Sequence, residues 1–272
     1  MATIRLSPAL RGEYLQLFDS CELRPERARE IEATLQRILA QQTRYQQVEA
    51  TTGVPWHFIA VVHQMESGGR FDCHLHNGDP LGARTRQVPR GRPRVGTPPF
   101  AWEPSAADAL AMHGLSSETD WGLASLLYEL ERYNGFGYRL HHPEVRSPYL
   151  WSFSVHYSSG KYVADGRWSH SARSAQCGAA TLLRRLVELG HAVIADQPPP
   201  ATNAAPMVVR YAKQKPASAA VLAQARALQR WLNGFPGVFL KIDGWPGQRT
   251  SSAWQQVTGY YLPGDPRAAT LR

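Results

Sequence analysis

The stretch Val54-Pro-Trp-His-Phe-Ile-Ala-Val-Val-His-Gln-Met-Glu-Ser-Gly-Gly69 decides how the first part of the chain folds. Proline is favoured in the first turn of a helix, so we expect a helix that begins near Pro55. Apolar residues recur at the three-to-four spacing of one helix face: Phe58, Ile59, Val62 and Met65. The two glycines that follow are expected to end this helix. Glu66 therefore lies at the apolar end of a predicted helix.

A polar loop follows, His74-Leu-His-Asn-Gly-Asp-Pro-Leu-Gly-Ala-Arg-Thr85, and it carries Asp79 and Thr85. Burial disfavours the charged form of a carboxyl group, so we expect the pKa of Glu66 to be raised. Asp79, in a wetter loop, is expected to stay ionised. Two carboxyl groups with pKa values pushed apart in this way are how a glycosidase separates its acid from its base.

The composition is that of an ordinary soluble globular protein, with 43% hydrophobic and 19% charged residues among 272. The net charge of +8 implies an anionic partner, and nucleic acid, anionic lipid and acidic cell-wall polymers all qualify. The N-terminus has no long apolar run, so we expect neither a cleaved signal peptide nor a membrane span. The odd number of cysteines, three, favours reduced thiols. A disulfide between Cys73 and Cys177 is an alternative that the sequence does not decide.

Periodicity predicts a mainly helical first domain with an irregular or short-stranded cleft wall. We expect helices over residues 25–45, 105–113, 121–133 and 172–189, besides the one that contains Glu66. Residues 72–104 are rich in Gly, Pro and Arg and are expected to form a long functional loop. The proline-rich segment 196–217 is predicted to be a linker between a first domain, 1–195, and a small last domain, 218–272.

The last domain contains Leu228-Gln-Arg-Trp-Leu-Asn233, then Leu240-Lys-Ile-Asp-Gly-Trp-Pro-Gly247, then Thr250-Ser-Ser-Ala-Trp254. This pattern resembles the small three-helix peptidoglycan-binding domain over about residues 218–266. The resemblance implies that Asp243 and Trp245 contact the cell wall. Physically, Asp243-Gly244 and Gly247 are expected to form a tight turn, and Thr250 to cap the next helix.

The first domain resembles the lysozyme superfamily, which includes lysozymes, lytic transglycosylases and phage endolysins. In that family a helix ends in the catalytic Glu, often followed by Ser, as in Glu66-Ser67. Asp79 and Thr85 keep the Asp-to-Thr spacing of phage-type lysozymes, although the interval from Glu to Asp is longer here. Tyr133 and Asn134, in the segment Glu131-Arg-Tyr-Asn-Gly135, are similar to the helix end that lines the cleft in lytic transglycosylases. The likeness extends over about residues 44–189.

This resemblance implies a muramidase that cleaves between N-acetylmuramic acid and N-acetylglucosamine. Glu66 would donate its proton to the glycosidic oxygen, while Asp79 and Thr85 would hold a water on the opposite face of the sugar. Inversion of this kind requires carboxyl groups about 6.5–9.5 Å apart. If Asp79 points away, Glu66 alone fits a lytic transglycosylase.

Histidine and arginine clusters offer other interpretations. His74 and His76 with Asp79 suggest zinc, as in a wall amidase, but His63-Gln-Met-Glu66 lacks the closing histidine of a zinc-binding helix. We therefore expect no metal or cofactor, and we expect both histidines to bind sugar. A run of arginines resembles a nucleic-acid patch without the interleaved aromatic residues: Arg84, Arg86, Arg90, Arg92 and Arg94. Arg84 is instead expected to grip substrate carboxylates.

The sequence thus predicts a monomeric, two-domain peptidoglycan hydrolase that acts without nucleic acid or membrane insertion. It would be made in the cytoplasm and reach the wall through a holin, a secretion apparatus or lysis, as a phage endolysin or an antibacterial effector does. The alternative from another class is a wall-binding protein without catalytic activity.

Overall fold

The computed structural model describes residues 4–164, 166–194, 209–235 and 237–271. The chain divides into two compact units, residues 1–186 and 187–272. Its secondary structure is mainly helical, which confirms the predicted class. The part of the predicted linker at 196–208 lies outside the described residues.

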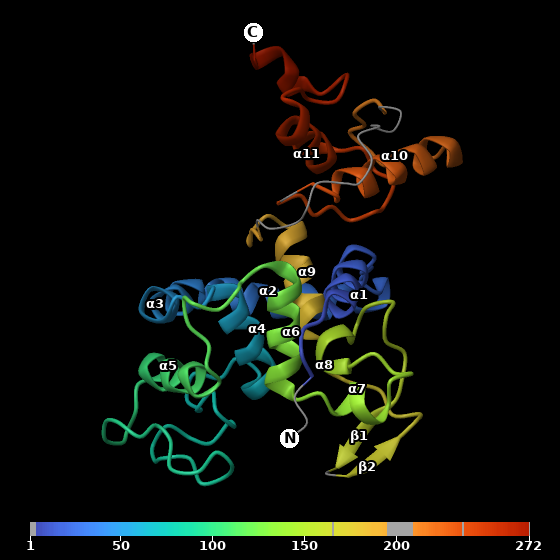
Figure 1. Ribbon diagram of the computed structural model, residues 1–272. Helices are drawn as coiled ribbons and strands as arrows, with labels where there is room; N and C mark the ends of the chain where they lie inside the picture. The colour runs from blue at the N-terminus through green and yellow to red at the C-terminus, as the bar shows by residue number, and fades with distance from the viewer. Residues whose placement is uncertain (1–3, 165, 195–208, 236, 272) are drawn as a thin grey trace. The chain divides into compact units, whose positions relative to one another are not determined.

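The first unit consists of helices and one short hairpin (Figure 1). Its helices are α1 (Pro8–Asp19), η1 (Pro25–Arg27, 3₁₀), α2 (Ala28–Ala40), α3 (Gln42–Thr52), α4 (Trp56–Ser67), α5 (Trp102–Met112), α6 (Leu123–Asn134), α7 (Gly137–His141), α8 (Pro148–Trp151) and α9 (Ala179–Glu188), the last continuing past the division between the units. The strands β1 (Lys161–Ala164) and β2 (Arg167–Ser169) pair antiparallel, with Tyr162 opposite Trp168.

Helix α4 forms where the sequence predicts it. Pro55 precedes its first residue, and every residue from 56 to 63 is buried, so the helix runs through the interior of the unit. Gly68 ends it in the left-handed conformation, with φ of 64°, which glycine adopts without steric cost. The core around α4 comes from the preceding helix α3, which packs against both α4 and α5, and from the more distant α6, which contacts both α1 and α4 (Figure 1).

Two predicted helices have different bounds in the structure. The helix expected over 25–45 breaks at Gln41, where α2 ends and α3 begins. The helix expected over 172–189 begins only at Ala179, because the chain before it passes tightly against α8. A Cβ added at Gly178 would lie 2.3 Å from the carbonyl oxygen of Leu150, so this close approach requires glycine. The long loop expected over 72–104 is present from Gly68 to Ala101 without a helix or a regular strand.

The second unit contains α10 (Ala219–Leu232), α11 (Gln248–Thr258) and the 3₁₀ helix η2 (Pro266–Leu271). Its apolar core draws on the two α-helices and on the segments beside them: Val209, Ala225, Leu228, Leu232, Val238, Leu240, Ala253 and Leu262. Val209 lies within the range predicted as linker, yet it is buried in this core. The folded part of the second unit therefore begins before residue 218.

The turn in the second unit forms as predicted, but Thr250 does not cap α11. The N-cap of α11 is Gly247, and Thr250 is the third residue of the helix. Its hydroxyl donates to the carbonyl oxygen of Trp245 (3.1 Å) and accepts from the buried amide of Gln229 (3.1 Å). Gln229 also accepts from the N–H of Gly244 at 2.9 Å, so this side chain fastens the turn to α10.

Three further features bear on the expectations from sequence. Cys73 and Cys177 are free thiols, so the structure contains no disulfide between them. In the described part of the chain, His, Cys, Asp and Glu side chains form no group of three that suits a metal ion. No helix among the described residues is long and apolar enough to cross a membrane.

A buried ionic cluster joins α1, α6 and α7. Glu131 is only 2% exposed, and Oε2 accepts from Nη2 of Arg139 at 2.8 Å and from the hydroxyl of Tyr14 at 2.5 Å. Arg139 also contacts Glu13 at 3.1 Å. Removal of one partner from a buried ion pair leaves a charge without compensation, which is far more costly than loss of an exposed pair.

The substitution Arg139→Ala is therefore expected to lower the free energy of unfolding of the first unit by about 3–5 kcal/mol. Arg146→Ala is the matched control, because Arg146 pairs with Glu13 at 2.7 Å while its side chain is 43% exposed. An exposed pair of this kind contributes about 0–1 kcal/mol. Urea denaturation of both variants measures the difference. Equal destabilisation by the two substitutions would contradict a special role for the buried cluster.

Candidate active site

Glu66 lies half-buried in the last turn of α4. Burial raises the pKa of its carboxyl group, because the carboxylate loses hydration there. The hydroxyl of Tyr149 donates a hydrogen bond of 2.9 Å to Oε1 of Glu66, and this contact lowers the pKa by a smaller amount. The net shift is upward, in the predicted direction. Glu66 therefore retains its proton at a higher pH than an exposed carboxyl group does.

Two tyrosines from other helices complete a cluster around Glu66. Tyr149 belongs to α8, and Tyr133 lies near the end of α6. Burial raises the pKa of both phenols, and the negative charge of Glu66 raises them further. Tyr133 also donates a hydrogen bond of 3.3 Å to the carbonyl oxygen of Leu75. Tyr133, a predicted substrate-binding residue, thus lies close enough to Glu66 for the charge of the carboxylate to act on it.

Tyr149 is the residue of this cluster that sequence reasoning misses. It stands in the aromatic segment Ser147-Pro-Tyr-Leu-Trp151, where nothing distinguishes it from the neighbouring aromatic residues. Pro148 at the start of α8 is the one local signal, because it predicts a helical turn that fixes the direction of the next side chain.

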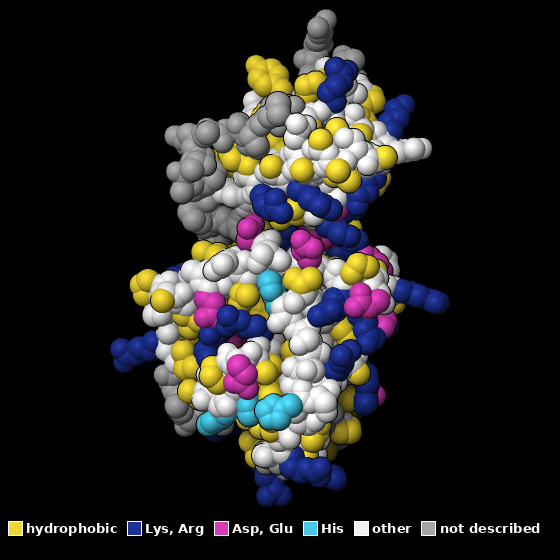
Figure 2. Space-filling model, turned by 90° about the vertical axis from the view of Figure 1, so that its right-hand side faces the viewer, with side chains coloured by type: hydrophobic (Ala, Val, Ile, Leu, Met, Phe, Trp, Pro, Cys, Tyr) yellow, Lys and Arg dark blue, Asp and Glu magenta, His cyan; other side chains and the backbone are white. Residues whose placement is uncertain are grey.

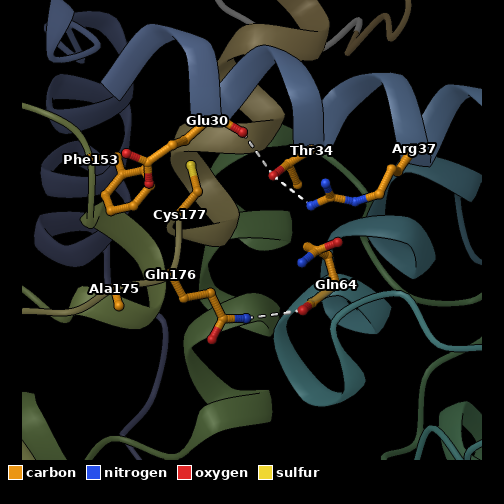
Figure 3. Close-up of a pocket in the computed structure, with 8 residues that line it drawn as sticks. All are labelled: Glu30, Thr34, Arg37, Gln64, Phe153, Ala175, Gln176 and Cys177. Atoms are coloured by element: carbon orange, nitrogen blue, oxygen red, sulfur yellow. Dashed lines mark hydrogen bonds between the residues drawn. The ribbon is translucent and has the colours of Figure 1, made fainter. Parts of the chain in front are cut away.

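Gln176 is a second residue that the sequence does not reveal. Its Nε2 donates to the carbonyl oxygen of Gln64 at 3.0 Å (Figure 3). The same nitrogen donates to the carbonyl oxygen of Met65, also at 3.0 Å. The last carbonyl groups of a helix have no partner within the helix, so a buried helix end needs donors from elsewhere. Gln176 supplies such a donor to the two residues directly before Glu66 and so fixes the backbone that carries the carboxyl group.

The two histidines of the following loop have supporting positions rather than sugar-binding ones. His74 is fully buried, and its ring nitrogens contact Oγ of Ser105 (2.7 Å) and the carbonyl oxygen of Ala83 (2.8 Å). The side chain of His76 is equally buried, with Nε2 2.8 Å from Oδ2 of Asp108. Neither side chain reaches the surface, so the prediction that they contact sugar is wrong. They join the loop to α5.

Asp79 has the predicted low pKa, for a reason that lies in the loop itself. Oδ2 accepts hydrogen bonds from the backbone N–H of Gln87 (3.1 Å) and of Arg86 (2.7 Å), and these contacts lower the pKa most. The side-chain amide of Asn77 donates to the same oxygen at 3.0 Å. One oxygen of the carboxylate is therefore committed to the loop fold.

Thr85 is buried and its hydroxyl is also committed. It donates to the carbonyl oxygen of Pro89 and accepts from the N–H of Arg92 at 2.9 Å. A hydroxyl has one proton to donate, and in Thr85 that proton closes the loop over residues 85–92. The predicted role of Thr85 in holding a water is therefore not supported by its contacts.

The Arg84 side chain is held by its own loop, whereas the Asn134 side chain is accessible to a ligand. Nη2 of Arg84 donates to the carbonyl oxygen of Gly96 at 2.7 Å, and the guanidinium lies 5.5 Å from the centre of the Phe100 ring. Arg84 thus folds back onto its own loop. Asn134 is exposed at the end of α6, next to Tyr133, and is free to contact a ligand.

In the second unit, Asp243 and Trp245 occupy the turn between α10 and α11. Oδ1 of Asp243 accepts from the N–H of Trp245 at 2.8 Å and from the amide of Gln229 at 2.9 Å. The indole of Trp245 is 40% exposed, and its N–H donates to the carbonyl oxygen of Ala212 at 2.9 Å. Asp243 therefore orders the turn, while Trp245 presents an aromatic face to solvent.

A protonated Glu66 beside Tyr133 and Tyr149 could donate a proton, so the cluster has a group that general-acid chemistry requires. The chain matches no protein-family model, and it matches neither a curated protein nor a solved structure.

The raised pKa of Glu66 predicts a pH-dependent effect of Glu66→Gln on stability. Because the pKa is higher in the folded than in the unfolded state, the stability that the carboxyl group provides is complete below its unfolded pKa. It is lost as pH rises through the folded pKa. The melting temperature of the variant should equal that of wild type near pH 4 and lie a few degrees above it at pH 7.5. Each kcal/mol of stability corresponds to a shift of about 2–4 °C.

Thermal unfolding followed by circular dichroism at the two pH values measures this difference. Glu118→Gln is the matched control, because Glu118 is exposed. A melting difference between wild type and Glu66→Gln that is the same at both pH values would disprove the linkage.

Proposed function

We propose that this protein cleaves the glycan strands of peptidoglycan between N-acetylmuramic acid and N-acetylglucosamine, with Glu66 as the general acid. The observation that carries the proposal is the half-buried carboxyl group at the end of a buried helix, with a raised pKa and a phenol on Oε1. A general acid works best when its pKa lies near the working pH, and burial moves a Glu in that direction.

In the proposed reaction Glu66 transfers its proton to the glycosidic oxygen as the bond to C1 of the muramyl residue breaks. The leaving N-acetylglucosamine then carries a free 4-hydroxyl. Positive charge that develops at C1 and the ring oxygen is neutralised by attack of an oxygen nucleophile. Tyr149 supports this step, because its hydroxyl keeps Oε1 in place and stabilises the carboxylate after proton transfer.

The identity of the nucleophile separates two forms of the proposal. In a hydrolase, a water activated by Asp79 attacks C1 and leaves a reducing end. In a lytic transglycosylase, the muramyl 6-hydroxyl attacks C1, its proton passes to Glu66, and a 1,6-anhydro end forms without water. The contacts of Thr85 and of Oδ2 in Asp79 with the loop backbone favour the second form, because Glu66 needs no second side chain there.

The second unit is proposed to hold the enzyme on the wall, with Trp245 as a contact to the polymer. Binding to an insoluble substrate raises the effective concentration of the catalytic unit at the next bond. The net charge of +8 adds attraction to an anionic surface. In Figure 2, Lys and Arg side chains are distributed over the visible face with Asp and Glu among them.

Mass spectrometry of the soluble products from purified sacculi tests the proposal. Wild type should release muropeptides, and Glu66→Gln should lower the initial rate by at least about 100-fold, as expected for loss of a general acid. Products with 1,6-anhydro ends, lighter by one water, identify a transglycosylase. In that case Asp79→Asn should keep most of the activity.

Other products would reject the proposal. Glycan-free peptides would indicate an amidase, and binding to sacculi without any soluble product would indicate a wall-binding protein. Equal rates for wild type and Glu66→Gln would exclude Glu66 as the acid.

Tyr149→Phe is expected to shift the pH profile of cleavage. The phenol lowers the pKa of Glu66, so its removal raises that pKa further. Activity requires protonated Glu66 and falls as pH rises through its pKa, so the alkaline limb should move upward by up to about one pH unit. Tyr260→Phe, on a side chain that is 75% exposed, is the control. An unchanged limb in Tyr149→Phe would show that the hydrogen bond does not act on the titrating group.

A further inference from the structure

A small polar cavity of about 230 Å³ lies in the first unit between η1 and two later segments, and it shares no residue with the Glu66 cluster. Six of its lining residues matter for its chemistry: Arg24, Glu26, Arg27, Ser152, Phe153 and Arg173. Three of these carry a guanidinium group and one carries a carboxylate. The cavity is therefore basic as well as polar.

Arg24 is held in place by the backbone of the opposite segment. Its Nε donates to the carbonyl oxygen of Ser154, and its Nη2 donates to that of Tyr157, each at 3.0 Å. The remaining Nη1 lies 3.7 Å from Oε1 of Glu26, too far for a hydrogen bond, and Glu26 has a side chain that is 63% exposed. An anion in the cavity would meet a guanidinium that is already ordered, so little side-chain entropy is lost on binding.

The other two arginines have unused donors. Arg27 uses Nη1 for Glu30 at 2.7 Å, and its guanidinium lies 4.7 Å above the ring centre of Phe153. Arg173 is exposed, and within the described part of the chain no hydrogen bond or ion pair occupies it. Arg173 can therefore turn toward a ligand without breaking a contact, and Arg27 has donors left besides the one that Glu30 occupies.

A buried hydroxyl in the cavity wall also lacks a partner. Ser152 is 1% exposed, and its Oγ has no hydrogen-bond partner among the described residues. A buried polar atom without a partner is costly, so a ligand that reached this hydroxyl would remove that cost. The next residue, Phe153, has φ of 69°, a conformation that side-chain-bearing residues rarely adopt. Such backbone strain clusters at ligand sites.

We infer that this cavity is a binding site for a phosphate group. A carboxylate offers two oxygens, which one arginine can satisfy by a forked pair of hydrogen bonds. Three guanidinium groups and a hydroxyl around one small cavity instead match a tetrahedral anion with several acceptor oxygens. The bound group is either free inorganic phosphate or a phosphodiester in an anionic polymer. This inference stands whether or not Glu66 cleaves glycan.

Nuclear magnetic resonance titration of the ¹⁵N-labelled full chain with inorganic phosphate tests the site. We expect saturable shifts of the backbone amides at 152–158 and at Arg173, with a Kd below about 5 mM. Arg173→Ala should weaken binding about tenfold, and Ser152→Ala about fivefold, because each removes one donor to the anion. Ser152→Ala should melt no lower than wild type, since the lost hydroxyl has no partner in the free protein.

Arg167→Ala is the matched control, because Arg167 is exposed on β2 and does not line the cavity. It should bind phosphate as wild type does. The inference is overturned if no saturable shift occurs up to 20 mM, a limit about four times the expected Kd. It is also overturned if Arg173→Ala and Ser152→Ala bind like wild type, if Arg167→Ala loses as much affinity as they do, or if acetate binds as tightly as phosphate.

A synthetic poly(glycerol phosphate) separates the two sources. Shifts at the same amides, weakened by the same variants, identify a phosphodiester in a polymer as a ligand. Shifts with inorganic phosphate alone identify a site for the free ion. Both results support the phosphate site and differ only in its natural ligand.

Discussion

The first unit depends on how α4 ends. A helix that runs through an apolar interior delivers its last carbonyl groups and a carboxyl group to a place with little water. The carbonyl groups need donors, and the carboxyl group must either stay neutral or find hydrogen bonds. Gln176 donates to the carbonyl groups. Burial keeps the carboxyl group neutral to a higher pH, and Tyr149 donates a hydrogen bond to it. Helices α6 and α8 and the segment before α9 must therefore converge on one turn, and the positions of these elements follow from it.

Local signals made α4 and its long following loop predictable. Pro55, the apolar repeat and Gly68 each act within a few residues, so periodicity and capping rules apply to them directly. Glu66 could be chosen for the same reason, since its position at the end of an apolar helix is itself a local fact. The break at Gln41 was not predictable in this way, because the apolar repeat continues through it to Tyr45, which is also buried.

The partners of Glu66 could not be read from the sequence. Tyr149 and Gln176 reach α4 from positions 83 and more than 100 residues away, and only the packed core brings them there. The errors have a related cause. Thr85 was assigned by its spacing from Asp79, His74 by its clustering with His76, and Thr250 by its place after the predicted turn. Such patterns identify a side chain without showing which atoms it faces. In each case nearby polar atoms of the protein occupy the hydroxyl or the ring, because a buried polar group must be satisfied locally.

Arginine has several separate uses in this chain. Arg139 neutralises a buried carboxylate, Arg24 binds two carbonyl groups, and Arg84 folds back over its own loop. The pair of Arg139 with Glu131 already cancels in the net charge of +8, whereas Arg24 and Arg84 keep their charge and commit only donors to carbonyl groups. Arg173 is exposed and can contact a partner. It lines the polar cavity between η1 and the segment that contains Ser152.

The distance in sequence between Glu66 and its two supports has a consequence for synthesis on the ribosome. Helix α4 can form early, but its carboxyl group gains Tyr149 only after α8 has emerged, and its carbonyl groups gain Gln176 later still. A nascent chain therefore holds the acidic residue without the surroundings that tune it. The surroundings of Glu66 are complete only after the segment that contains Gln176 has packed against α4. Truncated products of interrupted translation would carry Glu66 as an ordinary carboxylate.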